Sequence, residues 1–430
     1  MADTPTKPPE SGSSTPPPAR KGFLGRLAVA SESLKYREFR LLTMGSIVLG
    51  FGQWFQQIGL GWLVLQVTGS PIAMVTVTAV RGFAALGVSP LAGIAIDRFD
   101  RSKVVTFSTG LASIQAIILS ILVITNNLAH WEIYAFAIAE GVANGFYMPA
   151  RQALVSNVVP RESLPNAVVL NSMTQNMARV TGPVMAGAVV GLLGTGWAFA
   201  CLALCKILAA LWTWQIRSVA KTQKRASHKE PFLASLTGGV KYAVQNPAIG
   251  AIIFLGIIHS WVILPYLQML PFFAENVLHS GAQGYGILAT GVGWGSLVGL
   301  GAIAFVGSVK RKGMMTIVTL LGYALFVGLF SRSTWFPLSM VFLMGAGVVL
   351  SIHLAMRQTL LQLLTPDELR GRVFALTEIQ SGLQSLGAFP MAVAVEVIGP
   401  ADAVSAFCIA GAALTVLVAV LSPKLRATTV

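Results

Sequence analysis

Long stretches without Asp, Glu, Lys or Arg divide this 430-residue sequence into apolar segments. One stretch runs from Arg40 to Arg81, another from Lys103 to Glu132, and two more flank Glu275. A membrane-spanning helix needs about 20 predominantly apolar residues, so each stretch is long enough for at least one. The pattern predicts an all-α polytopic membrane protein with twelve transmembrane helices, over residues 41–67, 73–96, 104–124, 132–150, 166–193, 197–217, 248–273, 285–306, 314–331, 335–356, 373–397 and 402–421.

The composition agrees with a membrane location. Only 11% of the residues are charged and 54% are hydrophobic, whereas a soluble domain has about 25% charged residues. A soluble protein of this composition would lack the polar side chains needed to cover its surface. The chain is therefore expected to have the lipid bilayer as its solvent.

The net charge of +14, from 30 Lys and Arg residues, could indicate a nucleic-acid-binding protein. The loop residues argue otherwise, because in a twelve-helix chain nearly all of the basic loops fall on one side and Arg332 alone lies in a loop on the other. The positive-inside rule then places both termini in the cytoplasm of a cell (inner) membrane. The excess charge orients the protein, and no nucleic-acid partner is expected.

The predicted helices form two groups of six. The Pro/Ser/Thr-rich residues 1–33 are expected to be a disordered cytoplasmic tail. Residues 34–217 are predicted as the first six-helix bundle and 248–422 as the second. A cytoplasmic linker with an amphipathic helix is expected over 218–247, and a short cytoplasmic C-terminus over 423–430.

The two groups are related by duplication. The sequence ARQALVSNVVPRESL begins at Ala150 and MRQTLLQLLTPDEL begins at Met356, each between the fourth and fifth helix of its group. Identical residues occur at one offset of 206 (357 minus 151): Arg151, Gln152, Leu154, Pro160 and Glu162 match Arg357, Gln358, Leu360, Pro366 and Glu368. Duplicated halves in a membrane protein are typical of transporters with a site between the repeats.

The segment GIAIDRFDRSKV follows the second predicted helix and resembles the cytoplasmic loop signature of the major facilitator superfamily, with Gly93, Asp97, Arg98 and Arg101 in the matching positions. The resemblance implies two six-helix halves that open alternately, and a loop that latches the outward-open state. Arg151 is a candidate ionic partner of Asp97. The alternative is a loop that is basic only because it faces the cytoplasm.

In the fifth predicted helix, Gly182, Pro183 and Gly187 resemble the antiporter motif of exporters in the same superfamily, with Ala178 in place of the first glycine. The resemblance implies a bend in this helix, and ordinary close helix packing is the alternative. The segments PARQALVSNVVPRESLPNAVVLNS and LRGRVFAL are similar to the branch of enterobactin-type siderophore exporters and macrolide-efflux-like proteins.

A few ionisable residues interrupt the predicted spans. Such residues are costly in a bilayer and often mark proton relays or ion pairs. Glu140 is the first candidate for the proton carrier, and Arg179, Arg81 and Glu378 are further proton-coupling candidates. The alternative for Glu140 is a static ion pair with Arg81 or Arg179.

Uncharged polar residues recur at helical spacing within several spans. They are candidates for lining a central cavity: Gln53, Gln57, Asn144, Asn171, Gln175 and His259. Hydrogen bonding between helices is the alternative for each of them.

Nucleotide-binding loops, catalytic constellations and metal-ligand clusters are not found among the sequence motifs. We therefore expect no enzymatic activity, no cofactor and no metal, and an ion gradient as the energy source. The predicted function is proton-coupled efflux of a small lipophilic or siderophore-like compound by a monomer. Arg81, Arg179 and Lys206 favour anionic or zwitterionic cargo. An importer or lysophospholipid mover on the same fold, or a non-transporting sensor or scaffold, are the alternatives.

Overall fold

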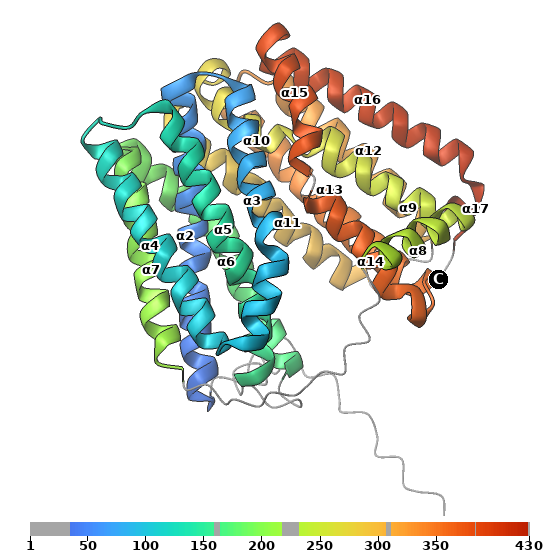
Figure 1. The fold of residues 1–430 in the computed structure, drawn as a ribbon. Helices are drawn as coiled ribbons and strands as arrows, with labels where there is room; N and C mark the ends of the chain where they lie inside the picture. The colour runs from blue at the N-terminus through green and yellow to red at the C-terminus, as the bar shows by residue number, and fades with distance from the viewer. Residues whose placement is uncertain (1–34, 159–163, 217–231, 307–310, 383, 429–430) are drawn as a thin grey trace, which may run out of the picture.

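The computed structural model describes residues 35–158, 164–216, 232–306, 311–382 and 384–428, and every regular element in these ranges is a helix. Figure 1 shows two bundles side by side, one blue to green and the other yellow to red. The N-terminal half contains α2 (Arg37–Thr68), α3 (Pro71–Arg98), α4 (Arg101–Ile124), α5 (His130–Val158), α6 (Leu164–Leu193) and α7 (Thr195–Trp214).

The C-terminal half begins with one segment that alternates between helix types: α9 (Pro247–Ile257), the π-helix η3 (Ile258–Ile263), α10 (Tyr266–Phe272) and the π-helix η4 (Phe273–Val277). It continues with α11 (Gly281–Val306), α12 (Lys312–Arg332), α13 (Phe336–Leu364), α14 (Asp367–Gly382), α15 (Gln384–Ile398), α16 (Pro400–Leu421) and α17 (Pro423–Ala427). Helix α8 (Phe232–Gln245) precedes this half and packs on α14, where Gly239 leaves space for Arg372.

Local sequence signals end and restart the helices in short turns. Gly69 adopts a left-handed φ of 62° after α2, and the hydroxyl of Ser70 accepts a hydrogen bond from the backbone N–H of Ala73 at the start of α3. The carboxylate of Asp100 accepts one from the N–H of Ser102 and so caps α4. These caps satisfy backbone groups that a helix end leaves unpaired.

Helices occupy all twelve predicted ranges, and nine of the described segments are long and apolar enough to cross a membrane. The other three are α2, α5 and the pair α14–α15. Their lower hydropathy has a simple cause in α2, which carries four glutamines, and in α5, which carries Glu140 and Asn144. The count of twelve spans stays a prediction, and the helices that fall short include those with the most polar positions.

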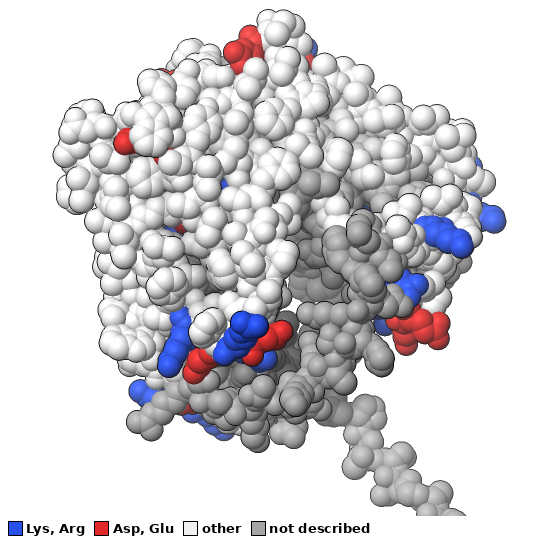
Figure 2. Space-filling view, in the orientation of Figure 1, with Lys and Arg blue, Asp and Glu red and all other residues white. Residues whose placement is uncertain are grey.

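The duplication predicted from sequence is visible in the helix boundaries. Helix α5 spans 130–158 and α13 spans 336–364, so both ends differ by 206 (336 minus 130, and 364 minus 158). Figure 2 shows that Lys, Arg, Asp and Glu are sparse on the surface between the charged margins. Large apolar side chains are exposed in the structure, among them Phe107 and Leu192, each 74% exposed. Such exposure of large apolar side chains suits a lipid environment.

The two halves touch near the turns that follow α2 and α6, which we call the far side. There α6 packs on α11, and α3 packs on α15. A Cβ placed on Gly187 would lie 2.8 Å from Cα of Gly286. The hydroxyl of Ser70 donates to the Glu396 carboxylate at 3.3 Å.

The opposite side, where α2 begins and Arg98 and Arg101 connect α3 to α4, we call the basic side. Here the halves diverge (Figure 1), and most of α3 after Arg81 is partly or fully exposed. The contacts described above hold the two halves together on the far side.

Candidate functional site

A cavity of about 510 Å³ lies within the N-terminal half. It extends from the middle of the helices to the third turn of α2 at Ser46 and to Arg151 on α5, toward the basic side. All six helices of the half contribute: the lining residues are Ser46, Leu49, Gly50, Gln53, Gln56, Arg81, Ser108, Thr109, Ala112, Glu140, Ala143, Asn144, Tyr147, Met148, Arg151, Gln175, Arg179, Leu202 and Lys206. The volume is within the range of small-molecule sites.

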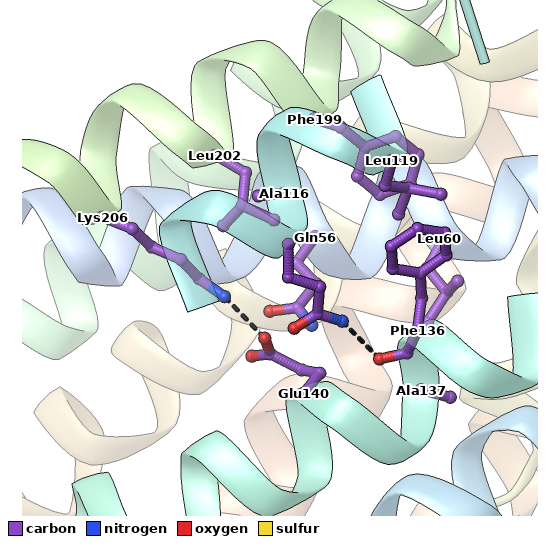
Figure 3. A pocket seen from close by; sticks show the side chains of 11 residues that line it. Gln56, Leu60, Ala116, Leu119, Phe136, Ala137, Glu140, Phe199, Leu202 and Lys206 are labelled. Atoms are coloured by element: carbon purple, nitrogen blue, oxygen red, sulfur yellow. Dashed lines mark hydrogen bonds and ion pairs between the residues drawn. The ribbon is translucent and has the colours of Figure 1, made fainter. Parts of the chain in front are cut away.

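One ion pair lies at the inner end of this cavity. Nζ of Lys206 on α7 is 2.7 Å from Oε2 of Glu140 on α5, and the two side chains are 8% and 14% exposed. Figure 3 shows the two side chains pointing toward one another across the gap between their helices. The prediction of an ion pair for Glu140 named the wrong partner, because Lys206, and not Arg81 or Arg179, holds the carboxylate.

A second, small cavity of about 30 Å³ lies on the other face of the ion pair. Gln56, Leu202, Glu140 and Lys206 line both cavities. Gln115 also lines the small cavity, and its side-chain amide donates to the backbone carbonyl of Phe136. A volume of this size can hold about one water molecule where several polar groups surround it.

Most of the predicted cavity and coupling residues line the large cavity. These are Gln53, Arg81, Glu140, Asn144, Gln175 and Arg179. Gln57 is exposed and is not part of this lining, and His259 lies in the core of the C-terminal half. Asn171 and Glu378 belong to α6 and α14, but their side chains lie outside the described part of the structure.

The cavity contains functional candidates that the sequence analysis did not select. Lys206 was counted as a cation, but its partner could not be identified, because a helical pattern does not show which faces of α5 and α7 meet. Gln56, Tyr147 and Thr109 were not identified as lining residues. Gln56 lies one turn from Gln53 on α2, and this spacing could have indicated it.

The loop between α3 and α4 connects to the same half through its arginine. Nη1 of Arg101 donates to the backbone carbonyl of Ala153 on α5 at 3.2 Å, and Nη2 of Arg151 donates to Oγ of Ser46 at 2.8 Å. Asp97 and Arg98 are exposed, and Gly93 has open space around its α-carbon. The latch function of this segment stays a prediction.

The glycines of the fifth predicted helix are contact positions. Gly182 packs against the indole of Trp54, and Gly187 packs against Gly286 of the other half. Helix α6 continues through Pro183 from Leu164 to Leu193. The predicted bend stays a prediction, whereas the close approach of two helices at Gly187 is a feature of the structure.

Comparisons with known proteins agree with this architecture. A family model described as transmembrane secretion effector, within the major facilitator superfamily, matches residues 29–429. The enterobactin exporter EntS of Shigella dysenteriae serotype 1 (strain Sd197) is 24% identical over 307 residues, covering 71% of this chain and 72% of that protein. EntS of Shigella flexneri is 25% identical with the same coverage.

Two solved structures show the same fold. A mutant of the nucleoside transporter NupG has a TM-score of 0.70 at 14% identity, covering 90% of this chain and 99% of NupG. A bacterial homologue of the human lysosomal transporter Spinster, inward-facing and unoccupied, has a TM-score of 0.66 at 12% identity, covering 91% of this chain and 96% of that protein.

Proposed function

Since the chain belongs to the transmembrane secretion effector family of the major facilitator superfamily, we propose that this membrane transporter is a proton-coupled exporter of a small acidic compound of the siderophore type. It works as a monomer in the cell (inner) membrane with both termini in the cytoplasm. The observation that carries the proposal is the cavity of the N-terminal half, which opens on the basic side and contains one buried ion pair and three further arginines.

The position of the cavity supports export. The positive-inside rule assigns the basic side to the cytoplasm, so the cavity is open to cytoplasmic substrate in this structure. The far side is closed by contacts between α6 and α11 and between α3 and α15. Rocking of the two halves about these contacts exposes the same cavity to the opposite side.

The charge of the cavity supports acidic cargo. Arg81 and Arg179 line it, and none of the described ion pairs includes either of them, whereas the Glu140 carboxylate is paired with Lys206. These two arginines therefore leave the cavity with an excess of positive charge. Guanidinium groups bind carboxylates and related anions with paired hydrogen bonds. The EntS relatives are exporters of enterobactin by name, and this chain is proposed to move a compound of related chemistry.

The ion pair supports coupling to protons. Glu140 lies between the large cavity on the basic side and the small cavity beyond it. The carboxylate of Glu140 can accept either a proton or a hydrogen bond from a hydroxyl group of an acidic substrate that enters the cavity. Binding of proton and substrate at the same pair makes them compete, which is the condition for exchange of one against the other.

Everted membrane vesicles with an inside-acid pH gradient test the proposal. Enterobactin, a small aromatic carboxylic acid and a cationic lipophilic dye are added in turn while a fluorescent dye reports the internal pH. We expect the two acidic compounds to discharge the gradient in vesicles that contain the protein and not in vesicles that lack it. Discharge by the cationic dye alone contradicts the acidic cargo.

A flux measurement decides the direction. Radiolabelled enterobactin is expected to accumulate inside energised everted vesicles, because their interior corresponds to the outside of the cell. Loss of preloaded label on energisation identifies an importer instead. If the label equilibrates across the membrane at a rate and to an extent independent of the pH gradient, the protein is a uniporter and Glu140 is structural.

A further inference from the structure

A second group of buried polar side chains lies in the C-terminal half, around His259 of η3 and His353 of α13. The two imidazole rings have centroids 5.5 Å apart, and the ring of His259 lies 5.7 Å from that of Tyr323 on α12. His353 is 0% exposed and His259 is 4% exposed. Both rings therefore lie in the protein interior, away from the cavity of the other half.

One hydrogen bond fixes the tautomer of His353. Its Nδ1 lies 3.0 Å from the backbone carbonyl oxygen of Thr316. A carbonyl oxygen only accepts, so Nδ1 carries the hydrogen, and Nε2 of the neutral ring is a base with a free lone pair. This Nε2 is buried without a hydrogen-bond partner among the described residues, and Nε2 of His259 is in the same situation.

Other buried polar atoms near the pair also lack partners. They are Nη1 of Arg357 and Oε1 of Gln380. Gln380 uses its Nε2 to donate to the hydroxyl of Ser260 at 2.9 Å, which leaves its oxygen unpaired. Such atoms are rare in folded proteins and destabilise them, so their concentration around two histidines indicates a function that is not fulfilled in this conformation.

The charge around the pair is positive. Arg357 follows His353 by one turn of α13, and none of the ion pairs of the described residues includes it. The helices around η3 add no other nearby charge: α9 has no ionisable residue, α12 contributes Tyr323, α16 contributes Cys408 and an Asp402 that pairs with Arg332, and α15 contributes a Glu396 that accepts from Ser70. Glu378 of α14 lies outside the described side chains.

The duplication shows what this group corresponds to. At the offset of 206, His259, His353 and Arg357 match Gln53, Tyr147 and Arg151, which all line the cavity of the N-terminal half. The same wall therefore exists in both halves. In the N-terminal half it faces an open cavity, and in the C-terminal half it is closed by packing against α12 and α14.

We propose that His259 and His353 form a proton-binding site of the C-terminal half, which takes up one proton in addition to the one carried at Glu140. The lone pair of Nε2 accepts the proton, and the product is an imidazolium ion. Beside Arg357 and away from water, this second positive charge is disfavoured. The pair therefore binds the proton when its half opens to water and releases it when the half closes around it.

This inference rests on the proposed proton-coupled export, and a static accumulation measurement separates the two. Purified protein is reconstituted into liposomes with the membrane potential clamped at zero and a pH gradient of one unit. With two protons per substrate, labelled enterobactin can accumulate about 100-fold, and with one proton about 10-fold. We expect His353→Asn and His259→Gln each to lower the accumulation about tenfold relative to the native protein.

The variants keep the fold-related contacts as far as possible. The amide N–H₂ of Asn can replace Nδ1 of His353 as donor to Thr316, and Gln is the residue found at the duplicated position of His259. Exchange of labelled for unlabelled enterobactin without a gradient should stay at the native rate. His130→Gln, which changes an exposed histidine, is the matched control and should not alter the accumulation.

Native accumulation in both variants, with native exchange, overturns the proton site and leaves the proposed export intact. If the native protein does not respond to the gradient, proton-coupled export fails, and the site is then judged by NMR of histidine-labelled protein in nanodiscs. The signals that disappear in His259→Gln and His353→Asn should change from those of neutral imidazole to those of imidazolium as the pH is lowered, and the change at one residue should shift when the other is replaced. Signals that stay those of neutral imidazole at every pH at which the protein remains folded overturn the site.

Discussion

The two halves of this transporter have the same arrangement of helices but contain different ionisable side chains in their interiors. At the centre of the N-terminal half, Lys206 and Glu140 form a pair beside an open cavity of about 510 Å³. At the duplicated position of Glu140 the C-terminal half has Ala346, which is 0% exposed and packed in an apolar core. The C-terminal half instead buries two histidines, with the half-buried Arg357 one turn after His353.

The difference shows how two duplicated halves can take on different functions. Charges of both signs beside a water-filled cavity can bind and release an ionic substrate. Neutral bases sealed in a core can respond only when the core opens. We therefore propose that the N-terminal half binds the cargo and that the C-terminal half responds to the conformational state by binding and releasing a proton.

The largest effect is expected from breaking the buried pair. Lys206→Met leaves the Glu140 carboxylate without its partner, and loss of one partner of a buried pair destabilises by about 3–5 kcal/mol. Denaturant titration of the protein in mixed micelles measures the loss. The double variant Glu140→Gln/Lys206→Met removes both charges and should recover most of the stability. A loss in the double variant equal to the sum of the two single losses contradicts an interacting pair.

The arginines of the cavity should decide the charge of the cargo. Arg179→Gln removes a cation that is exposed to the cavity, and a hydrogen bond to a charged group contributes about 1.5–3 kcal/mol. The Kd for an acidic substrate should rise about 10- to 100-fold in equilibrium binding, while that of a neutral analogue stays unchanged. Ser385→Ala changes the duplicated position in the C-terminal half and serves as the control. If a cationic drug binds tightly and its Kd is the same in Arg179→Gln as in the native protein, acidic cargo is contradicted.

The contact between the halves on the far side can be strained selectively. In Gly187→Val the new side chain meets Cα of Gly286 at 2.8 Å, and overpacking costs about 1–3 kcal/mol. The state closed on the far side should lose population about 5- to 150-fold. A cysteine at Gln53 then reacts faster with an impermeant maleimide supplied from the far side. Gly110→Val, placed where the described structure leaves open space, should not change this rate.

The smallest effect is expected for the exposed ion pair between Arg332 and Asp402 in the C-terminal half. Nη1 of Arg332 lies 2.7 Å from Asp402, the same separation as in the buried pair, but the side chains are 61% and 57% exposed. An exposed pair contributes about 0.2–1 kcal/mol. Asp402→Asn should therefore change the denaturation midpoint slightly, and less at high salt. If Asp402→Asn loses as much stability as Lys206→Met, burial does not explain a difference between the two ion pairs.

Much of the fold followed from the sequence, because apolar periodicity and charge-free length determine where helices form. The predicted ranges agree with the helices to within a few residues at many ends, and the family resemblance at Gly93 to Arg101 is confirmed by the family match. Helices α5 and α13 even preserve the offset found from five identities. The interruption of the seventh predicted helix by η3 and η4 had no counterpart in the pattern of apolar residues.

The site was harder to predict. A periodic pattern shows which residues share a face of one helix, but it does not show which other helix packs against that face. Glu140, Gln53 and Gln175 were identified as polar residues in apolar helices, and all three line the cavity. The pairing of Glu140 with Lys206 depends on the rotation of α5 and α7 about their axes, which no local signal encodes. His259 was expected beside a cavity, but the equivalent wall of its half is closed in this structure.

The central claim is that a proton on Glu140 drives export, and accumulation by a variant with a neutral pair tests it most directly. The double variant Glu140→Gln/Lys206→Gln leaves no unpaired charge, so its fold should persist and its exchange of labelled enterobactin can be compared with the native rate. Under a pH gradient of one unit and zero potential, we predict that this variant accumulates about tenfold less substrate than the native protein. Accumulation equal to that of the native protein would contradict the claim and make the Glu140–Lys206 pair a structural element.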